Sequence, residues 1–226
     1  MTAGIHIIND HQSVQISSGT IPMVYQRKIR HNLRVENMLS LRRDHGGVSV
    51  YVPPSDTSRI MEYGIFQPFG TDHAHILKDR IAGDLFIDEY IFEPKIQKST
   101  NIGMQLFDEN GTEIFNSDSL PLVILGHTSI NLADTWNNHK SYSFFSDVYQ
   151  KTKLGFLFTN LPSGITKSPS MAEIWAYDYR FFSSEGSIGL AIKPNVWSYS
   201  WSNANIPINY DLKAELFVID LSHIPD

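Results

Sequence analysis

The segment Ile174-Trp-Ala-Tyr-Asp-Tyr-Arg-Phe181 carries an aromatic side chain at every second position from Trp175 onward. Side chains two residues apart lie on the same face of a β-strand, so this segment predicts a strand with one aromatic face. The segment Trp197-Ser-Tyr-Ser-Trp201 alternates in the same way, with serines between three aromatic residues. Both segments therefore predict β-strands, and no stretch of a dozen residues carries a convincing helical stripe.

The rest of the chain has the texture of an all-β protein. Its apolar runs are short and rich in Ile, Val, Phe and Tyr, and turn-forming residues interrupt them about every ten residues. This spacing is typical of β-sandwiches and barrels. We therefore expect an antiparallel all-β fold with little helix, either a β-sandwich or two small packed β units.

The composition of the 226 residues fits a folded protein and excludes several kinds of site. Charged residues make up only 19% of the chain and hydrophobic residues 42%, which argues against a disordered chain. The net charge of −6 does not favour a nucleic-acid partner. Because there is no cysteine, disulfides and thiolate metal sites are excluded. We expect no membrane insertion and synthesis in the cytoplasm, since no apolar run approaches a membrane span and the N-terminus does not resemble a signal peptide.

An internal repeat links distant parts of the chain. Residues 4–24 align without a gap to residues 103–123, at an offset of 99 residues, with Gly, Ser, Pro and Val at shared positions. A weaker third copy spans residues 189–208. Each copy has a polar turn between two short apolar segments, which is the pattern of a β-hairpin. The predicted turns lie at residues 9–12, 108–111 and 193–196.

The repeat also suggests how the chain is organised. Because it restarts near residues 98–102, we expect an N-terminal β unit over residues 1–98 and a C-terminal β unit over residues 99–226. The alternative is that the whole chain is one domain.

The second copy, Gly103-Met-Gln-Leu-Phe-Asp-Glu-Asn-Gly-Thr-Glu-Ile-Phe-Asn-Ser-Asp-Ser119, resembles the hairpin motif of minor tail proteins of tailed bacteriophages. The shared pattern is a Gly, an apolar pair, Asn or Asp, a turn Gly, then an aromatic residue followed by Asp or Asn and Ser. The resemblance implies a structural protein of the virion, in the tail or its tip, made in the host cytoplasm. Its implied partners are other phage tail proteins and further copies of itself, and it implies no catalytic residues.

Signatures of enzymes and metal sites are missing or weak. The motifs of nucleotide-binding loops, serine hydrolases and zinc proteases are absent. His73 and His75 would share a strand face, but the sequence nominates no third ligand. The oxygen-rich run Asp108–Glu113 lacks calcium-loop spacing, and the pair Asp88-Glu89 is one of many acidic pairs that a glycosidase could use. We therefore predict no catalytic residues, no metal and no cofactor.

Four basic residues are the candidate partner-binding site. Residues 1–43 carry a net charge of +4, so the remaining residues carry −10. Regions of opposite sign can dock a chain against its own copies or against a complementary neighbour. A solvated basic strand is the other interpretation. The candidates are Arg27, Lys28, Arg30 and Arg34.

The aromatic segments are the second candidate site. Trp175, Tyr177, Trp197 and Trp201 would form flat platforms suited to sugar rings if they were exposed. Their burial in the core of a sandwich is the favoured interpretation, because large aromatic side chains stabilise cores strongly. The alternative function is therefore a carbohydrate- or receptor-binding β-sandwich module that uses an aromatic face.

Overall fold

A computed structural model of the chain describes part of it, in eighteen β-strands and no α-helix. Every strand pair is antiparallel, so the prediction of an antiparallel all-β fold is confirmed. The described residues are 4–8, 13–17, 22–36, 38–40, 46–52, 61–66, 73–77, 84, 86–95, 103–131, 142–145, 153–160, 163–167, 172–184, 187–199, 210–211 and 213–226.

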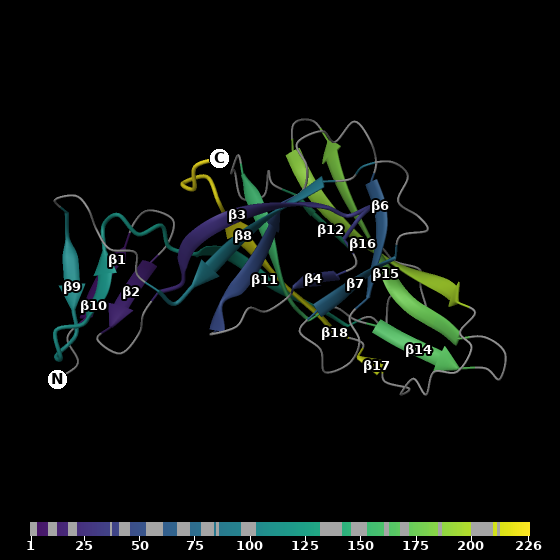
Figure 1. Cartoon of the computed structure of the whole chain (residues 1–226), viewed down its shortest axis with the longest axis horizontal. Helices are drawn as coiled ribbons and strands as arrows, with labels where there is room; N and C mark the ends of the chain where they lie inside the picture. The colour runs from purple at the N-terminus through teal and green to yellow at the C-terminus, as the bar shows by residue number, and fades with distance from the viewer. Residues whose placement is uncertain are drawn as a thin grey trace.

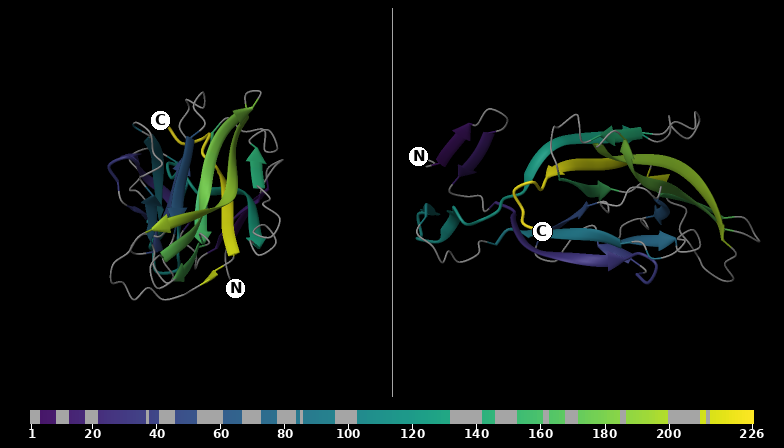
Figure 2. Two further views of the ribbon diagram at one scale, coloured as in Figure 1. Left: turned by 90° about the vertical axis from the view of Figure 1, so that its right-hand side faces the viewer. Right: turned by 90° about the horizontal axis from the view of Figure 1, so that it is seen from above.

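One layer of the molecule is a six-stranded sheet with the strand order β11-β18-β13-β5-β8-β3. The right-hand view of Figure 2 shows β11 and β3 at its two opposite margins. Its strands are β3 (Val24–Asn32), β5 (Val48–Val52), β8 (Phe86–Glu93), β11 (Val123–Asn131), β13 (Leu154–Asn160) and β18 (Lys213–Asp220).

The second layer is an eight-stranded sheet with the order β12-β16-β15-β6-β7-β4, and β14 and β17 pair beside β15. The Tyr51 hydroxyl of the six-stranded sheet donates a hydrogen bond to the Ser40 carbonyl of β4 and so joins the layers. The strands are β4 (Met38–Ser40), β6 (Met61–Phe66), β7 (His73–Leu77), β12 (Tyr142–Phe145), β14 (Ser163–Lys167), β15 (Ala172–Ser184), β16 (Ser187–Tyr199) and β17 (Tyr210–Asp211).

Two separate hairpins stand at the end of the molecule away from the eight-stranded sheet (Figure 1). The first pairs β1 (Gly4–Ile8) with β2 (Ser13–Ser17), and the second pairs β9 (Gln105–Phe107) with β10 (Glu113–Asn116). They are the first two copies of the sequence repeat, so the hairpins predicted there are confirmed. The connecting residues 9–12 of the first hairpin lie outside the described residues.

The turn of the second hairpin is held by its own backbone and one side chain. Asp108 Oδ1 accepts hydrogen bonds from the backbone N–H groups of Asn110 at 2.9 Å and Thr112 at 2.7 Å. Gly111 has a φ of 77°, the left-handed conformation that favours glycine. This carboxylate oxygen therefore helps to hold the turn.

The third predicted hairpin is wrong. Residues 193–196 lie inside β16, where Lys193 and Pro194 pair with Asp178 and Tyr177 of β15. A long ladder between two thirteen-residue strands outweighs the local turn signal. Proline is tolerated there because β12 pairs with β16 only as far as Ile192, which leaves that edge without a described partner strand.

The repeat extends beyond the hairpins into the six-stranded sheet. The strands that follow them, β3 and β11, both have nine residues and keep the offset of 99. Their ladders are irregular at the same place, between Tyr25 and Arg27 in β3 and between Ile124 and Gly126 in β11. The two copies therefore share backbone geometry as well as sequence pattern.

The strand order of both large sheets is duplicated, apart from β14 and β17, which have no counterpart in the first half. Across the six-stranded sheet, β3, β8 and β5 of the first half are followed by β13, β18 and β11 of the second half. The equivalent strands, β3 and β11, β8 and β18, and β5 and β13, thus occur in reverse order. In the eight-stranded sheet, β4-β7-β6 corresponds to β12-β16-β15 in the same way. The halves meet at a seam, where Tyr51 of β5 pairs with Phe156 of β13 and β6 pairs with β15. Both large sheets thus contain strands from either side of residues 98–102, and a division into two units stays a prediction.

An apolar cluster among the described residues covers the outer face of the six-stranded sheet with residues from both halves. On the outer side of the six-stranded sheet, Tyr25 N donates to the Leu120 carbonyl at 2.9 Å and Leu122 N donates to the Met23 carbonyl at 2.8 Å. Met23 and Leu122 are equivalent positions of the repeat, so the two copies contact each other at matching residues. The cluster beneath them consists of Val50, Tyr90, Phe92, Leu157, Ile219, Leu221 and Ile224.

Candidate functional site

The predicted basic site lies on and just after β3, the edge strand of the six-stranded sheet. Lys28 forms an ion pair with Asp88 at 3.0 Å and its ammonium lies 5.4 Å from the centre of the Tyr90 ring. Burial would lower the pKa of Lys28, but its hydrogen bonds with Asp88 and Tyr90 outweigh that effect and raise the pKa. Lys28 is therefore engaged within the chain.

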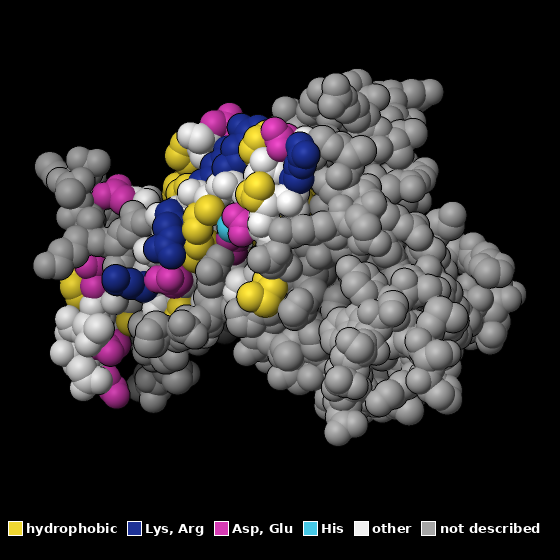
Figure 3. Space-filling model, turned by 45° about the vertical axis from the view of Figure 1, so that its right-hand side comes forward, with side chains coloured by type: hydrophobic (Ala, Val, Ile, Leu, Met, Phe, Trp, Pro, Cys, Tyr) yellow, Lys and Arg dark blue, Asp and Glu magenta, His cyan; other side chains and the backbone are white. Residues whose placement is uncertain are grey.

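Arg30 and Arg34 are more exposed than Lys28 but also have partners within the chain. The Arg30 guanidinium lies 4.8 Å from the centre of the Phe86 ring, and Arg34 lies 3.9 Å from Asp84. Arg27 is exposed, and its side chain has no ion-pair partner among the described residues. In Figure 3 the Lys and Arg side chains on this face alternate with Asp and Glu. Much of the predicted charge complementarity is thus met between β3 and β8.

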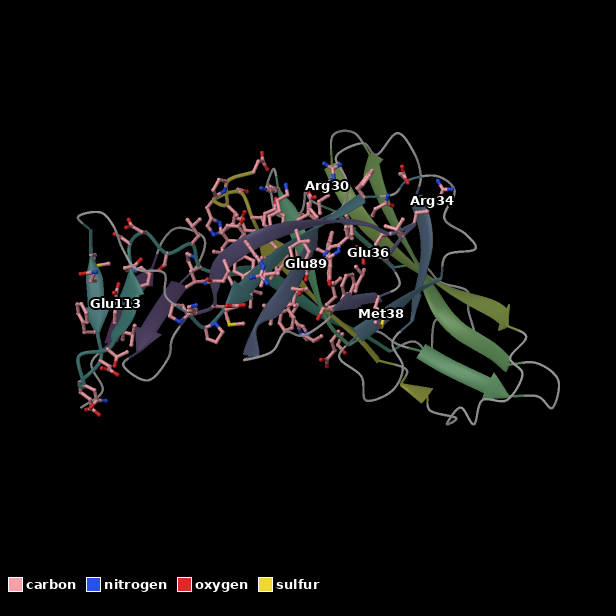
Figure 4. The ribbon with its side chains drawn as sticks, in the orientation of Figure 1. Arg30, Arg34, Glu36, Met38, Glu89 and Glu113 are labelled. Carbon is pink, nitrogen blue, oxygen red and sulfur yellow. The ribbon has the colours of Figure 1, made fainter. Side chains whose placement is uncertain are left out.

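A buried carboxylate, Glu89, lies on the face of β8 opposite to Asp88, the partner of Lys28. Glu89 is labelled in Figure 4. Glu89 is fully buried, and its Oε2 lies 2.6 Å from His31 Nε2. The buried Ser49 hydroxyl donates to the other carboxylate oxygen. Glu36 lies 3.7 Å from His31 Nδ1. The hydrogen bond with Glu89 raises the pKa of His31 despite partial burial, so the imidazolium form is stabilised.

This arrangement is not a nucleophile triad. The Ser49 hydroxyl donates to the carboxylate and is 1% exposed, so it is neither activated by the imidazole nor accessible to a substrate. Asp88 and Glu89 are neighbours on one strand and point to opposite faces, so they do not flank a common cleft. Within the described ranges, no three His, Asp or Glu side chains come together as a metal site. The network links β3, β5 and β8 through His31, Ser49 and Glu89.

The aromatic candidates occupy two different faces. In the β15–β16 ladder, Trp175 is paired with Val196 and Tyr177 with Pro194, whereas Trp197 is paired with Ile174. Directly paired residues share a face and neighbours alternate, so the positions of Trp175 and Tyr177 lie opposite that of Trp197. These candidates therefore do not form one platform. Trp201 lies outside the described residues, and His73 and His75, for which the sequence predicts no metal site, both lie on β7.

Exposed apolar side chains form a feature that sequence reasoning missed. On β9 and just before it, Met104 is 44% and Phe107 54% exposed. Val35 follows β3, Met38 lies on β4, Phe86 on β8 and Ile124 on β11. The hairpin motif was visible in the sequence, but alternation within three residues of strand does not identify the solvent side. The full set of exposed large hydrophobic residues, among those described, is Val35, Met38, Phe86, Met104, Phe107 and Ile124.

Comparisons with known proteins give no relative: no family model, no curated protein and no solved structure matches this chain. Among the described residues, no helix has the length and apolar character needed to cross a membrane.

Proposed function

We propose that this chain is a non-enzymatic structural component of a tailed-bacteriophage virion, a minor tail or tail-tip protein that assembles through its β surfaces. The observation that carries the proposal is the second hairpin. It has the sequence pattern of phage tail hairpins, stands outside the sandwich, and exposes Met104 and Phe107. Exposed apolar side chains on a hydrogen-bonded hairpin suit burial against another protein.

The buried network and the basic residues of β3 support a structural role because neither presents a reactive group to a substrate. His31, whose pKa is raised by its hydrogen bond with Glu89, is bound to a carboxylate that is itself buried. The basic candidates are largely engaged with β8 and Asp84. Neither arrangement offers a substrate a reactive group, which favours assembly over catalysis.

The test is the presence of the chain in purified particles of a phage that encodes it, measured by mass spectrometry. Replacing Met104 and Phe107 with serine should reduce incorporation severalfold, because the hairpin loses its exposed apolar contacts but keeps its backbone pairing. The matched control is Gln105→Ser, which changes an exposed residue on the same strand. Absence of the unchanged protein from virions would refute the proposal.

The alternative, a carbohydrate- or receptor-binding module, gains one argument from the strand register. The two aromatic sets lie on opposite faces of the β15–β16 ladder, so at most one of them can be turned toward the six-stranded sheet. The test is binding of the purified chain to a glycan array. Loss of binding in only one of the two single variants, Trp175→Ala and Trp197→Ala, would favour this alternative and identify the face.

A further inference from the structure

The two margins of the six-stranded sheet have the same backbone geometry. After its irregular position, each edge strand runs regularly for six residues, from Arg27 to Asn32 in β3 and from Gly126 to Asn131 in β11. Among the described strands, β11 pairs only with β18 and β3 only with β8. A free edge presents unpaired N–H and C=O groups that can accept a strand from another chain.

The two edges differ in the side chains that they carry. β3 holds Arg27, Lys28 and Arg30, and cations on an edge strand oppose the addition of another strand. The equivalent positions on β11 are Gly126, His127 and Ser129, and the whole strand Val123–Asn131 contains no Lys, Arg, Asp or Glu. Ile124 on this strand is also 47% exposed. β11 is therefore the edge without charged protection.

We propose that β11 is a self-association edge, where it pairs antiparallel with β11 of a second copy of this chain. An uncharged strand meets its own copy without repulsion, whereas two β3 strands would bring six cations together. The seam between β5 and β13 is an internal precedent, because equivalent strands of the two halves already pair antiparallel there. The pairing would join the six-stranded sheets of two molecules into one continuous sheet. The inference rests on the proposed function only in taking β surfaces as the means of assembly.

The first test introduces positively charged side chains on β11, as they occur on β3. The double change His127→Lys and Ser129→Arg places the cations of Lys28 and Arg30 at the equivalent positions. Sedimentation equilibrium of the full chain in the micromolar range should give a dimer, and the double variant should weaken dimerisation at least about tenfold. The control adds the same charge away from the edge, by Gln105→Lys and Asn110→Arg on the second hairpin, and should leave the dimer unchanged.

The second test uses the absence of cysteine from the chain. Single changes to cysteine at Ile124, His127 and Ser129 introduce one thiol each along the edge. In a symmetric antiparallel pair, only the position nearest the twofold axis meets its own copy within disulfide distance. Mild oxidation should therefore crosslink one position strongly and the others weakly. Equal crosslinking at all three positions would indicate random collision and overturn the proposal.

The outcomes separate this inference from the proposed function. A monomer at every concentration, or a dimer that persists in the double variant, overturns pairing through β11 even if the chain is present in virions. A β11 dimer of a chain that is absent from virions supports this inference and refutes the virion role. Thermal unfolding of each variant checks that loss of the dimer is not loss of the fold.

Discussion

The two halves of the six-stranded sheet share one strand plan but bury different chemistry. β8 pairs with β3, and β18 pairs with β11, the strand equivalent to β3. The two ladders therefore align β8 with β18 at an offset of 127 residues, and Leu216 is equivalent to Glu89. Pairing with β5 and β13 likewise places Phe156 at the position of Ser49. Leu216 and Phe156 are both 1% exposed. One half therefore has a buried polar network where the other has an apolar core, and each serves as an internal control for the other.

The comparison teaches that the polar network is not needed to build this strand plan. The second half forms the same three-stranded unit with apolar residues, so Glu89 and Ser49 add a requirement that the fold itself does not impose. Buried ion pairs cost desolvation that their attraction only partly offsets. The network is thus a local specialisation of the first half, placed next to its charged edge strand.

The largest expected effect comes from converting His31 to the residue at its equivalent position, Ile130. His31→Ile leaves the fully buried Glu89 without its closest cationic partner and should destabilise the protein by up to about 3–5 kcal/mol. Adding Glu89→Leu, which matches Leu216, should restore much of that loss. Urea unfolding of the two single variants and the double variant measures the coupling. Additive effects would mean that the two side chains do not act as a pair.

A smaller effect is expected at the seam, where one half has a glycine and the other a valine. Gly155 is equivalent to Val48, and a Cβ at Gly155 would overlap Val50 Cγ1 and approach Leu221 Cδ1 to 2.8 Å. Gly155→Val should therefore cost about 1–3 kcal/mol through overpacking. Its unfolding midpoint in urea should rise partway back when Val50→Ala is added. No loss in the single variant would show that the two halves can separate slightly at the seam.

The smallest expected effect is the pH dependence of the melting temperature, which should come from the half that contains His31. The pKa of His31 is raised in the folded protein, so its protonation stabilises the fold fully below the unfolded value of about 6.5. This contribution is lost as the pH rises through the raised folded pKa. The melting temperature should therefore fall by a few degrees, about 2–4 °C, between pH 6 and pH 9. The double variant His31→Ile/Glu89→Leu should lose most of this slope, and an unchanged slope would assign it to other groups.

The sequence predicts the hairpins because their signal is local. A turn glycine, an Asx side chain and a shared spacing lie within twenty residues, and the structure confirms two of the three hairpins. The third failed because Lys193-Pro-Asn195 is a turn signal only where no long ladder competes with it. A two-residue connection between Ser184 and Ser187 makes the hairpin there instead.

The rest of the duplication could not be found by ungapped comparison. The offset between equivalent strands grows from 99 at β3 to 107 at β5 and 127 at β8, because the second half holds longer connections and the extra strands β14 and β17. The burial of Glu89 was equally hidden. Sequence presents Asp88-Glu89 as one acidic pair, whereas the strand sends one carboxylate to Lys28 and the other to His31.

The seam also determines in what order the chain can fold. Its pairing of Tyr51 with Phe156 joins residues 105 positions apart, while β15 and β16 are joined by a two-residue connection. Closing a long loop costs entropy before its contacts form, so hairpins form first and distant pairings later. We expect each half to assemble its own strands before the seam closes. Until then the uncovered edges of β5 and β13 can pair with another molecule, and newly made chains are most open to strand exchange during that interval.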